Sequence, residues 1–91
     1  MKHGVESVVI QRACALTIRG LRKKSGYAQE ALALDSGIDR AYMSRLERGV
    51  HAPNLDTIFK LLPLLDVTFV EFATEMEACI RSVKRKRPEK K

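Results

Sequence analysis

The chain has 91 residues and a formal net charge of +6, with three Phe, two Tyr and no Trp. This length predicts one small domain with a modest core. The cysteines and histidines stand at positions 3, 14, 51 and 79, a spacing that matches no metal-ligand motif. No nucleophile–base arrangement or glycine-rich phosphate loop is apparent, so we expect no metal, no cofactor and no enzymatic activity.

The two cysteines, in a chain without an apparent signal peptide, favour reduced thiols and a cytoplasmic location. Both lie on apolar stripes, where thiols are usually inert. The densest apolar stretch, 61–65, is far too short to span a bilayer. We therefore expect no association with a membrane.

The excess positive charge is confined to one end of the chain. Residues 81–91 contain seven Lys or Arg and one Glu, whereas residues 1–80 contain ten charges of each sign. We expect a folded domain over 1–80 and a basic tail over 81–91 that frays beyond Val83 and is disordered after Pro88. The tail is either a solubilising end or an arm that gives salt-sensitive affinity for nucleic acid.

The first predicted element is a helix over residues 5–24. Its apolar residues recur three and four apart along two neighbouring lines, one through Ile18 and Leu21 and the other through Val9 and Leu16. Apolar character on two sides indicates either deep burial or contact with a partner, and burial is the commoner explanation.

Residues 29–49 predict two short helices joined by a tight turn. Ala33 is small enough for a close helix crossing, and Gly37 can adopt the left-handed conformation that ends a helix. Asp39 can cap a second helix over 39–48, with Met43 and Leu46 facing inward. Its outer faces then carry small side chains and arginines: Arg40, Ala41, Ser44, Arg45 and Arg48. Such a helix fits the major groove of DNA, although ordinary helical hairpins have the same pattern.

Two further helices are predicted. Asn54 can cap one that starts at Leu55, and Pro63 is expected to kink it or end it early. Thr68 and Glu71 form a capping box that opens the last helix. An apolar stripe on this helix runs beyond what the core needs, and nothing in the remaining chain is available to cover it. We therefore expect a second subunit to meet Phe72, Met76, Cys79, Ile80 and Val83.

Six positions follow the helix-turn-helix signature: Gln29, Ala33, Gly37, Ile38, Met43 and Leu46. With the flanking segments IRGLRKKSG and HAPNLDTIFKLL, the chain resembles the Cro/lambda-repressor-like (XRE-type) domain of bacterial and phage regulators over residues 14–73. The resemblance implies an all-α, five-helix domain with an extended C-terminal helix, and it implies DNA binding.

The resemblance also implies roles for single residues. Four side chains of the recognition helix would face base edges: Arg40, Ala41, Ser44 and Arg45. The arginines suit bidentate contacts with guanine. Four others would touch the phosphate backbone: Gln29, Tyr42, Arg48 and Asn54. Tyr42 fits a half-buried packing role equally well.

Two positions bear on how the domain holds together. In the family an arginine at the position of Arg22 pairs with a glutamate at that of Glu47, which would tie the first helix to the recognition helix. Ala28 stands where the family usually has a capping Ser or Thr, so that Ser25 or water would have to substitute.

We expect a sequence-specific regulator of transcription that binds an inverted repeat in double-stranded DNA as a homodimer. The simplest role is a repressor of its own or a neighbouring promoter. The short architecture resembles the controller proteins of restriction–modification systems. The alternatives are an antitoxin-like module whose main partner is a toxin, and a protein that binds nucleic acid nonspecifically, mainly through the basic tail. RNA polymerase is another candidate partner.

Overall fold

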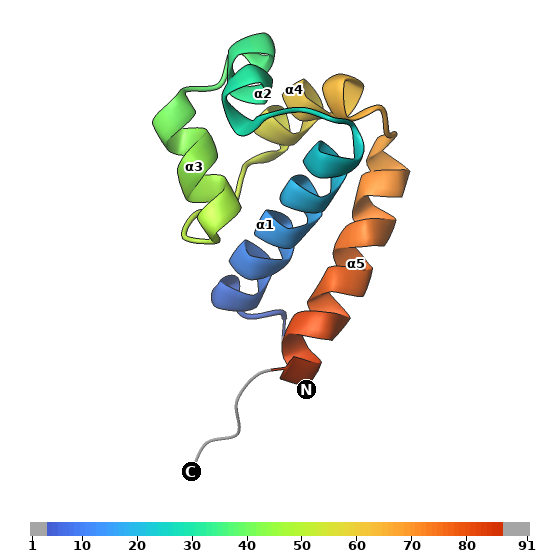
Figure 1. Cartoon of the computed structure of the whole chain (residues 1–91). Helices are drawn as coiled ribbons and strands as arrows, with labels where there is room; N and C mark the ends of the chain where they lie inside the picture. The colour runs from blue at the N-terminus through green and yellow to red at the C-terminus, as the bar shows by residue number, and fades with distance from the viewer. Residues whose placement is uncertain (1–3, 87–91) are drawn as a thin grey trace.

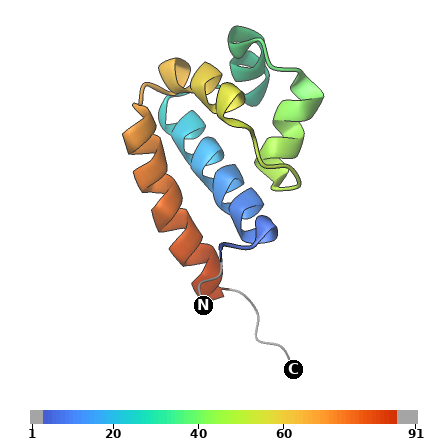
Figure 2. The same cartoon turned by 180° about the vertical axis from the view of Figure 1, so that it is seen from behind.

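A computed structural model describes residues 4–86, and this part of the chain is built from five α-helices joined by short loops (Figure 1). The helices are α1 (Ser7–Lys24), α2 (Gln29–Ser36), α3 (Arg40–Arg48), α4 (Leu55–Leu65) and α5 (Phe69–Lys86). The predicted all-α fold class is confirmed. The two long helices, α1 and α5, lie side by side in opposite directions, and α2, α3 and α4 gather on the other side of α1 (Figures 1 and 2).

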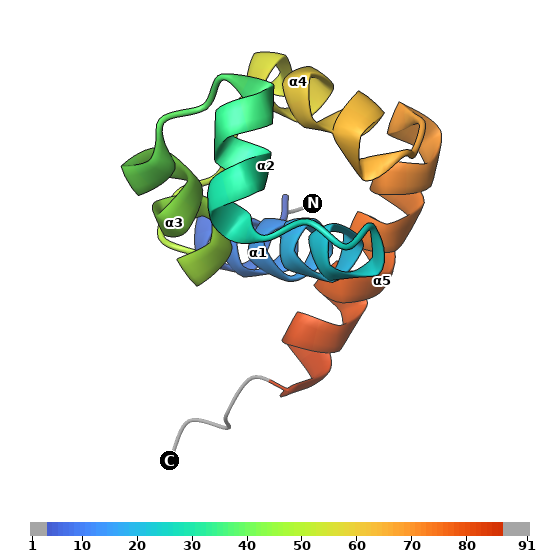
Figure 3. The same ribbon diagram turned by 45° about the horizontal axis from the view of Figure 1, so that its top comes forward.

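Every helix contributes a side chain to the centre of the molecule. Ile18 of α1, Leu32 of α2, Met43 of α3, Leu61 of α4 and Phe72 of α5 are each at most 1% exposed. α4 closes the far side of the core, next to α2 and the start of α5 (Figure 3). Burial of these large apolar side chains is the main stabilising contribution to so small a domain.

The apolar stripe of α5 is covered from within the chain. Phe72 and Val83 are only 1% and 8% exposed, and the Met76 sulfur lies 3.8 Å from the Cys14 thiol of α1. The prediction that nothing in the chain covers this stripe is therefore wrong for Phe72 and Val83. The reason is that α1 is apolar on two sides. One side faces α2, α3 and α4, and the other packs against α5 and covers part of its stripe. Met76, Cys79 and Ile80 are half-exposed, so their contact with a second subunit stays a prediction.

The predicted end of α2 and the predicted starts of α3, α4 and α5 are confirmed. Gly37 ends α2 in the left-handed conformation, at φ 76°. The side chain of Asp39 accepts a hydrogen bond from the backbone of α3 at 3.1 Å, and Asn54 accepts one from α4 at 2.8 Å. Thr68 and Glu71 exchange the two bonds of the capping box, at 2.8 and 3.1 Å.

α4 does not end early at Pro63. The helix continues to Leu65, and Asp66 then adopts a left-handed conformation with φ 59°. Pro63 removes one hydrogen bond, the one that would reach the carbonyl of Phe59. Phe59 is 52% exposed, and the missing bond falls in the last turns of the helix.

α5 also continues further than predicted. The expected fraying beyond Val83 is wrong, because the helix extends to Lys86 and the buried Val83 anchors its last turns on α1. The expected division between residues 80 and 81 thus falls inside a helix. The expected disorder after Pro88 concerns residues outside those described.

Within residues 4–86, no helix is both long and apolar enough to cross a membrane. The same part of the chain contains no group of His, Cys, Asp or Glu side chains that could hold a metal ion.

Candidate nucleic-acid interface

The outer side of α3 is the candidate interface. This nine-residue helix is buried through Met43, Leu46 and Glu47, and it lies at one edge of the molecule (Figure 1). The four side chains predicted to face bases all lie off the buried side: Arg40 and Ala41 are exposed, and Ser44 and Arg45 are half-exposed. Arg48, at the end of the helix, is exposed as well.

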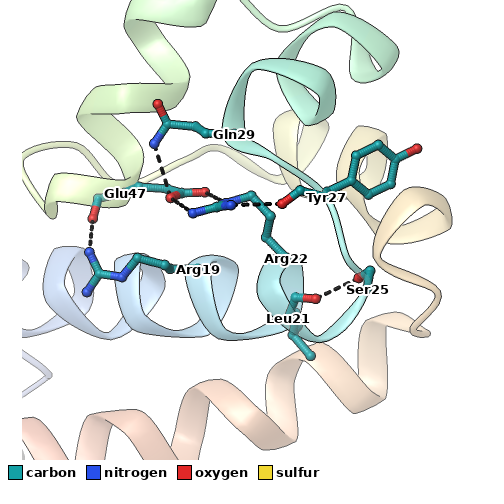
Figure 4. Close-up of polar contacts among 7 residues, drawn as sticks. All are labelled: Arg19, Leu21, Arg22, Ser25, Tyr27, Gln29 and Glu47. Atoms are coloured by element: carbon teal, nitrogen blue, oxygen red, sulfur yellow. Dashed lines mark hydrogen bonds and ion pairs between the residues drawn. The ribbon is translucent and has the colours of Figure 1, made fainter.

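The Glu47 carboxylate anchors α3 to the rest of the domain (Figure 4). It is 3% exposed and accepts two hydrogen bonds from the Arg22 guanidinium, at 2.6 and 2.9 Å, so the predicted ion pair is confirmed. Gln29 of α2 donates a third bond to it at 3.1 Å. A buried ion pair with a forked geometry and further hydrogen bonds is directional, and it therefore restricts how α3 can turn.

Two further donors extend this network. Arg19 donates to the backbone carbonyl of Glu47 at 3.0 Å, which satisfies one of the free carbonyls near the end of α3. Arg22 also donates to the carbonyl of Tyr27, at 2.8 Å, and so ties in the loop before α2 (Figure 4). Sequence reasoning missed the part played by Arg19, although its spacing of one helical turn from Arg22 is a usable signal.

Gln29 has a role that the sequence did not predict. We expected it to touch the DNA backbone, but its side-chain amide donates to Glu47 in the free protein. One amide hydrogen and the carbonyl oxygen remain available. The phosphate contact therefore stays a prediction, while the link from α2 to α3 is observed.

Arg40 is paired before any DNA is present. Its guanidinium forms an ion pair with Glu30 of α2, and both side chains are well exposed, at 71% and 66%. Exposed pairs of this kind contribute roughly 0–1 kcal/mol. The Glu30 carboxylate can therefore orient Arg40 without preventing the guanidinium from binding elsewhere.

Arg45 lies over an aromatic ring. Its guanidinium carbon is 5.7 Å from the centroid of the Tyr42 ring, within the range of cation–π attraction. Tyr42 also packs against the core, as one of its two predicted roles requires, and meets His51 edge-on at a centroid distance of 5.8 Å. The contact with His51 joins α3 to the following loop, and no periodic spacing in the sequence signals it.

Asn54 uses its side-chain oxygen to cap α4, so only its amide group remains free for the predicted phosphate contact. The residues expected at the interface thus fall into two groups. Those of α3 share one outer side, whereas Gln29 and Asn54 flank it and already serve structural roles.

Two short helices that meet through a glycine turn, the second of them presenting arginines and small side chains, define a helix-turn-helix domain. The helix-turn-helix family model matches residues 18–72, and the chain belongs to this family.

Among its relatives, the HTH-type transcriptional regulator SlrR of Bacillus subtilis (strain 168) is 40% identical over 55 residues, which are 59% of this chain and 36% of SlrR. The uncharacterized HTH-type transcriptional regulator y4dJ of Sinorhizobium fredii is 39% identical over 54 residues, which are 59% of this chain and 70% of that protein. The chain therefore spans well under half of SlrR but most of y4dJ.

A solved structure extends the likeness beyond the family match. The restriction-modification controller protein C.Esp1396I, as a tetramer in complex with its natural 35 base-pair operator, is 26% identical. The two folds agree with a TM-score of 0.71 over 79% of this chain and 95% of that one.

Proposed function

We propose that this protein is a sequence-specific DNA-binding regulator of transcription that inserts α3 into the major groove. The observation that carries the proposal is the two-sided character of α3. Its inner side is anchored through Glu47, and its outer side offers the four predicted base-reading residues. The names of the relatives and the operator complex of the similar controller support it.

In this proposal Arg45 makes the main base contact. A guanidinium can bind O6 and N7 of guanine in a bidentate manner, and the Tyr42 ring beneath it limits the directions it can take. Arg40 is a second candidate, released from Glu30 on binding. Gln29, Tyr42, Arg48 and Asn54 are assigned to phosphates, where they set the register of the helix.

We further propose that the protein binds an inverted repeat as a homodimer, through a surface other than the predicted stripe. Phe72 and Val83 have almost no exposed surface left for a partner. By contrast, Phe59 and Phe69 stack at 5.1 Å and remain 52% and 39% exposed. We call these two residues, with Leu55 and Val70, the α4–α5 patch.

The α4–α5 patch suits a second copy because Leu55, one helical turn before Phe59, and Val70, which follows Phe69 in the chain, are 60% and 72% exposed. A contiguous apolar patch on a small monomer marks an interaction site, and a twofold dimer places the same patch on both partners. Such a dimer would present two copies of α3 to half-sites about 34 Å apart, one turn of DNA.

The role of autoregulatory controller is the narrower form of the proposal. The likeness to C.Esp1396I extends over 95% of that chain, which is more than the helix-turn-helix alone. A reporter driven by the DNA upstream of this chain's own coding sequence should respond to the protein. An unchanged reporter would rule out autoregulation but not DNA binding.

Selection of bound duplexes from a random pool at near-physiological salt tests the DNA-binding proposal. We expect an inverted repeat with half-sites about one helical turn apart. Arg45→Ala should then weaken binding to that site by roughly 1–3 kcal/mol and blur one base position. Lys24→Ala, at an exposed basic residue of α1 outside the predicted interface and the basic tail, is the control. No enrichment, or an equal loss on random DNA, would contradict the proposal.

Sedimentation of two leucine variants tests the proposed dimer surface. Leu55→Asp places a charge in the α4–α5 patch and should shift the protein to monomer. Leu34→Asp introduces the same change at a leucine of α2 that is 80% exposed outside the patch, and it should leave the dimer intact. Dimerisation that survives Leu55→Asp would move the interface elsewhere.

A further inference from the structure

A pocket of about 340 Å³ opens where the end of α3 meets α1 and the last turns of α5. Its apolar part is formed by Ala15 and Leu16 of α1 and Val83 of α5. α1 lies between the other two helices here (Figure 1). This pocket is separate from the α4–α5 patch, and it shares Arg48 with the residues of α3 that are predicted to contact DNA.

Three arginines line the pocket, one at the end of α3 and two on α1: Arg48, Arg12 and Arg19. Within residues 4–86, neither Arg12 nor Arg48 forms an ion pair, and Arg19 donates only to a backbone carbonyl. Among the described residues that line the pocket, Glu47 is the one carboxylate, and its oxygens are already bonded to Arg22 and Gln29. The pocket therefore combines an apolar surface with two arginines, Arg12 and Arg48, that no acidic side chain of residues 4–86 pairs with.

We propose that this pocket binds a small organic anion, a carboxylate carried on a short apolar body. Guanidinium groups bind carboxylates through paired, charge-assisted hydrogen bonds, and Leu16, 41% exposed at the pocket, gains from being covered by an apolar chain. The volume lies at the lower end of the roughly 300–1,000 Å³ typical of small-molecule sites. A DNA backbone would satisfy the arginines but has no apolar part to cover Leu16.

Occupancy of the pocket would affect DNA binding, and this part rests on the proposed function. Arg48 is both a lining residue and a predicted phosphate contact, so an anion that binds it removes charge from the DNA-facing end of α3. Gly49, which follows it, packs closely on α1, since a Cβ there would lie 3.5 Å from the Arg12 Cα. A bound anion and DNA should therefore weaken each other by the same factor.

Calorimetric titration of the full chain tests the site without DNA. The probe is octanoate, compared with acetate, which lacks the apolar body, and octylamine, which has the opposite charge. We expect saturable one-to-one binding of octanoate, much weaker binding of acetate and none of octylamine. Equal binding of octanoate and octylamine, or no saturable binding at millimolar octanoate, would overturn the proposal.

Two variants locate the binding. Arg12→Gln should weaken octanoate binding about tenfold, the effect of losing one charge-assisted contact of roughly 1.4 kcal/mol. Leu16→Asp should abolish it by placing a carboxylate in the pocket. Arg81→Gln and Leu34→Asp repeat these changes at exposed positions outside the pocket and should bind as the parent does. Unchanged affinity in Arg12→Gln and Leu16→Asp, with normal thermal unfolding, would exclude this pocket.

Titration in the presence of a selected duplex separates the two proposals. A fold-change in octanoate affinity equal to the fold-change in DNA affinity supports the coupling. Octanoate binding with unchanged DNA affinity would overturn the coupling and leave the anion site standing. If no duplex is ever selected, the proposed function fails, while the anion site is still decided by calorimetry alone.

Discussion

The α2–α3 pair and the α1–α5 pair are held by different kinds of contact. α3 has nine residues and buries Met43, Leu46 and the charged Glu47, which accepts hydrogen bonds from α1 and α2. α5 has 18 residues and packs along α1 through side chains such as Phe72 and Val83. The short helix thus depends on a polar network and the long one on apolar burial.

This difference matters for function. Apolar burial stabilises a helix but is non-directional, whereas a forked ion pair tolerates little rotation. A helix that reads bases must present its side chains at a defined angle, and an error of about one ångström can break a bidentate contact. The polar network lies under α3, where orientation counts, and the apolar contacts lie along α5, where stability counts.

The largest expected effect tests the α1–α5 side of this comparison. Phe72→Ala should lower the free energy of unfolding by about 3–5 kcal/mol, because Phe72 is a fully buried aromatic side chain. Val70→Ala, at a residue 72% exposed in the same helix, should change it by less than about 0.5 kcal/mol. Urea unfolding of dilute protein measures both. If Phe72→Ala changed only the oligomeric state, the stripe would after all face a partner.

A somewhat smaller effect tests the polar network. Glu47→Ala should cost about 3 kcal/mol, since it leaves the Arg22 guanidinium, 12% exposed, without its partner. The double variant Arg22→Met, Glu47→Leu should recover most of that stability but not DNA affinity, because apolar contacts do not orient α3. Full DNA affinity in the double variant would show that burial alone positions the helix.

Removing one helix cap and adding another should change the free energy of unfolding by about 1 kcal/mol in opposite directions. Asp39→Ala removes the cap of α3 and should destabilise the protein by about that amount. Ala28→Ser should stabilise it, because Ala28 has an extended backbone, φ −74° and ψ 152°, and no side-chain cap. Ser25 does not substitute, since its hydroxyl bonds to Leu21. Loss of stability in Ala28→Ser would mean that the start of α2 is held in another way.

The smallest effect is confined to alkaline pH. Burial, with a lesser contribution from Cys79, raises the pKa of the Cys14 thiol from 9.0 to about 11. The folded state then retains its proton where the unfolded chain loses it, so the stability that Cys14 contributes is present below pH 9 and lost between pH 9 and 11. The midpoint temperature of thermal unfolding should therefore fall more steeply between pH 9 and pH 11 in the parent than in Cys14→Ala. Parallel curves would show that the thiol is not buried against α5.

Local features of the chain were predictable from the sequence because they act within a few residues. The left-handed Gly37 and the caps at Asp39, Asn54 and Thr68 each depend on a backbone group no more than three residues away. The outward set of α3 follows from helical periodicity alone. The Arg22–Glu47 pair is different: it joins distant positions and was reached only through resemblance to a family.

Apart from the ends of α4 and α5, the errors concern which surfaces meet. Spacing within one helix shows that a side is apolar but not what covers it, so the stripe of α5 was assigned to a second subunit. Likewise Gln29 was not expected to bond to Glu47, because nothing in its own spacing points to a partner in the next helix.

The amino-acid sequence by itself determined the helices, the starts of α3, α4 and α5 and the residues that α3 turns outward, since propensity, capping and periodicity act over one or two turns. Only the tertiary structure decided that α1 is covered on both sides, that Phe59 and Phe69 are left exposed, and that three arginines surround an apolar pocket. The physical reason is that burial and charge balance depend on how whole helices pack together, which no local pattern in the chain specifies.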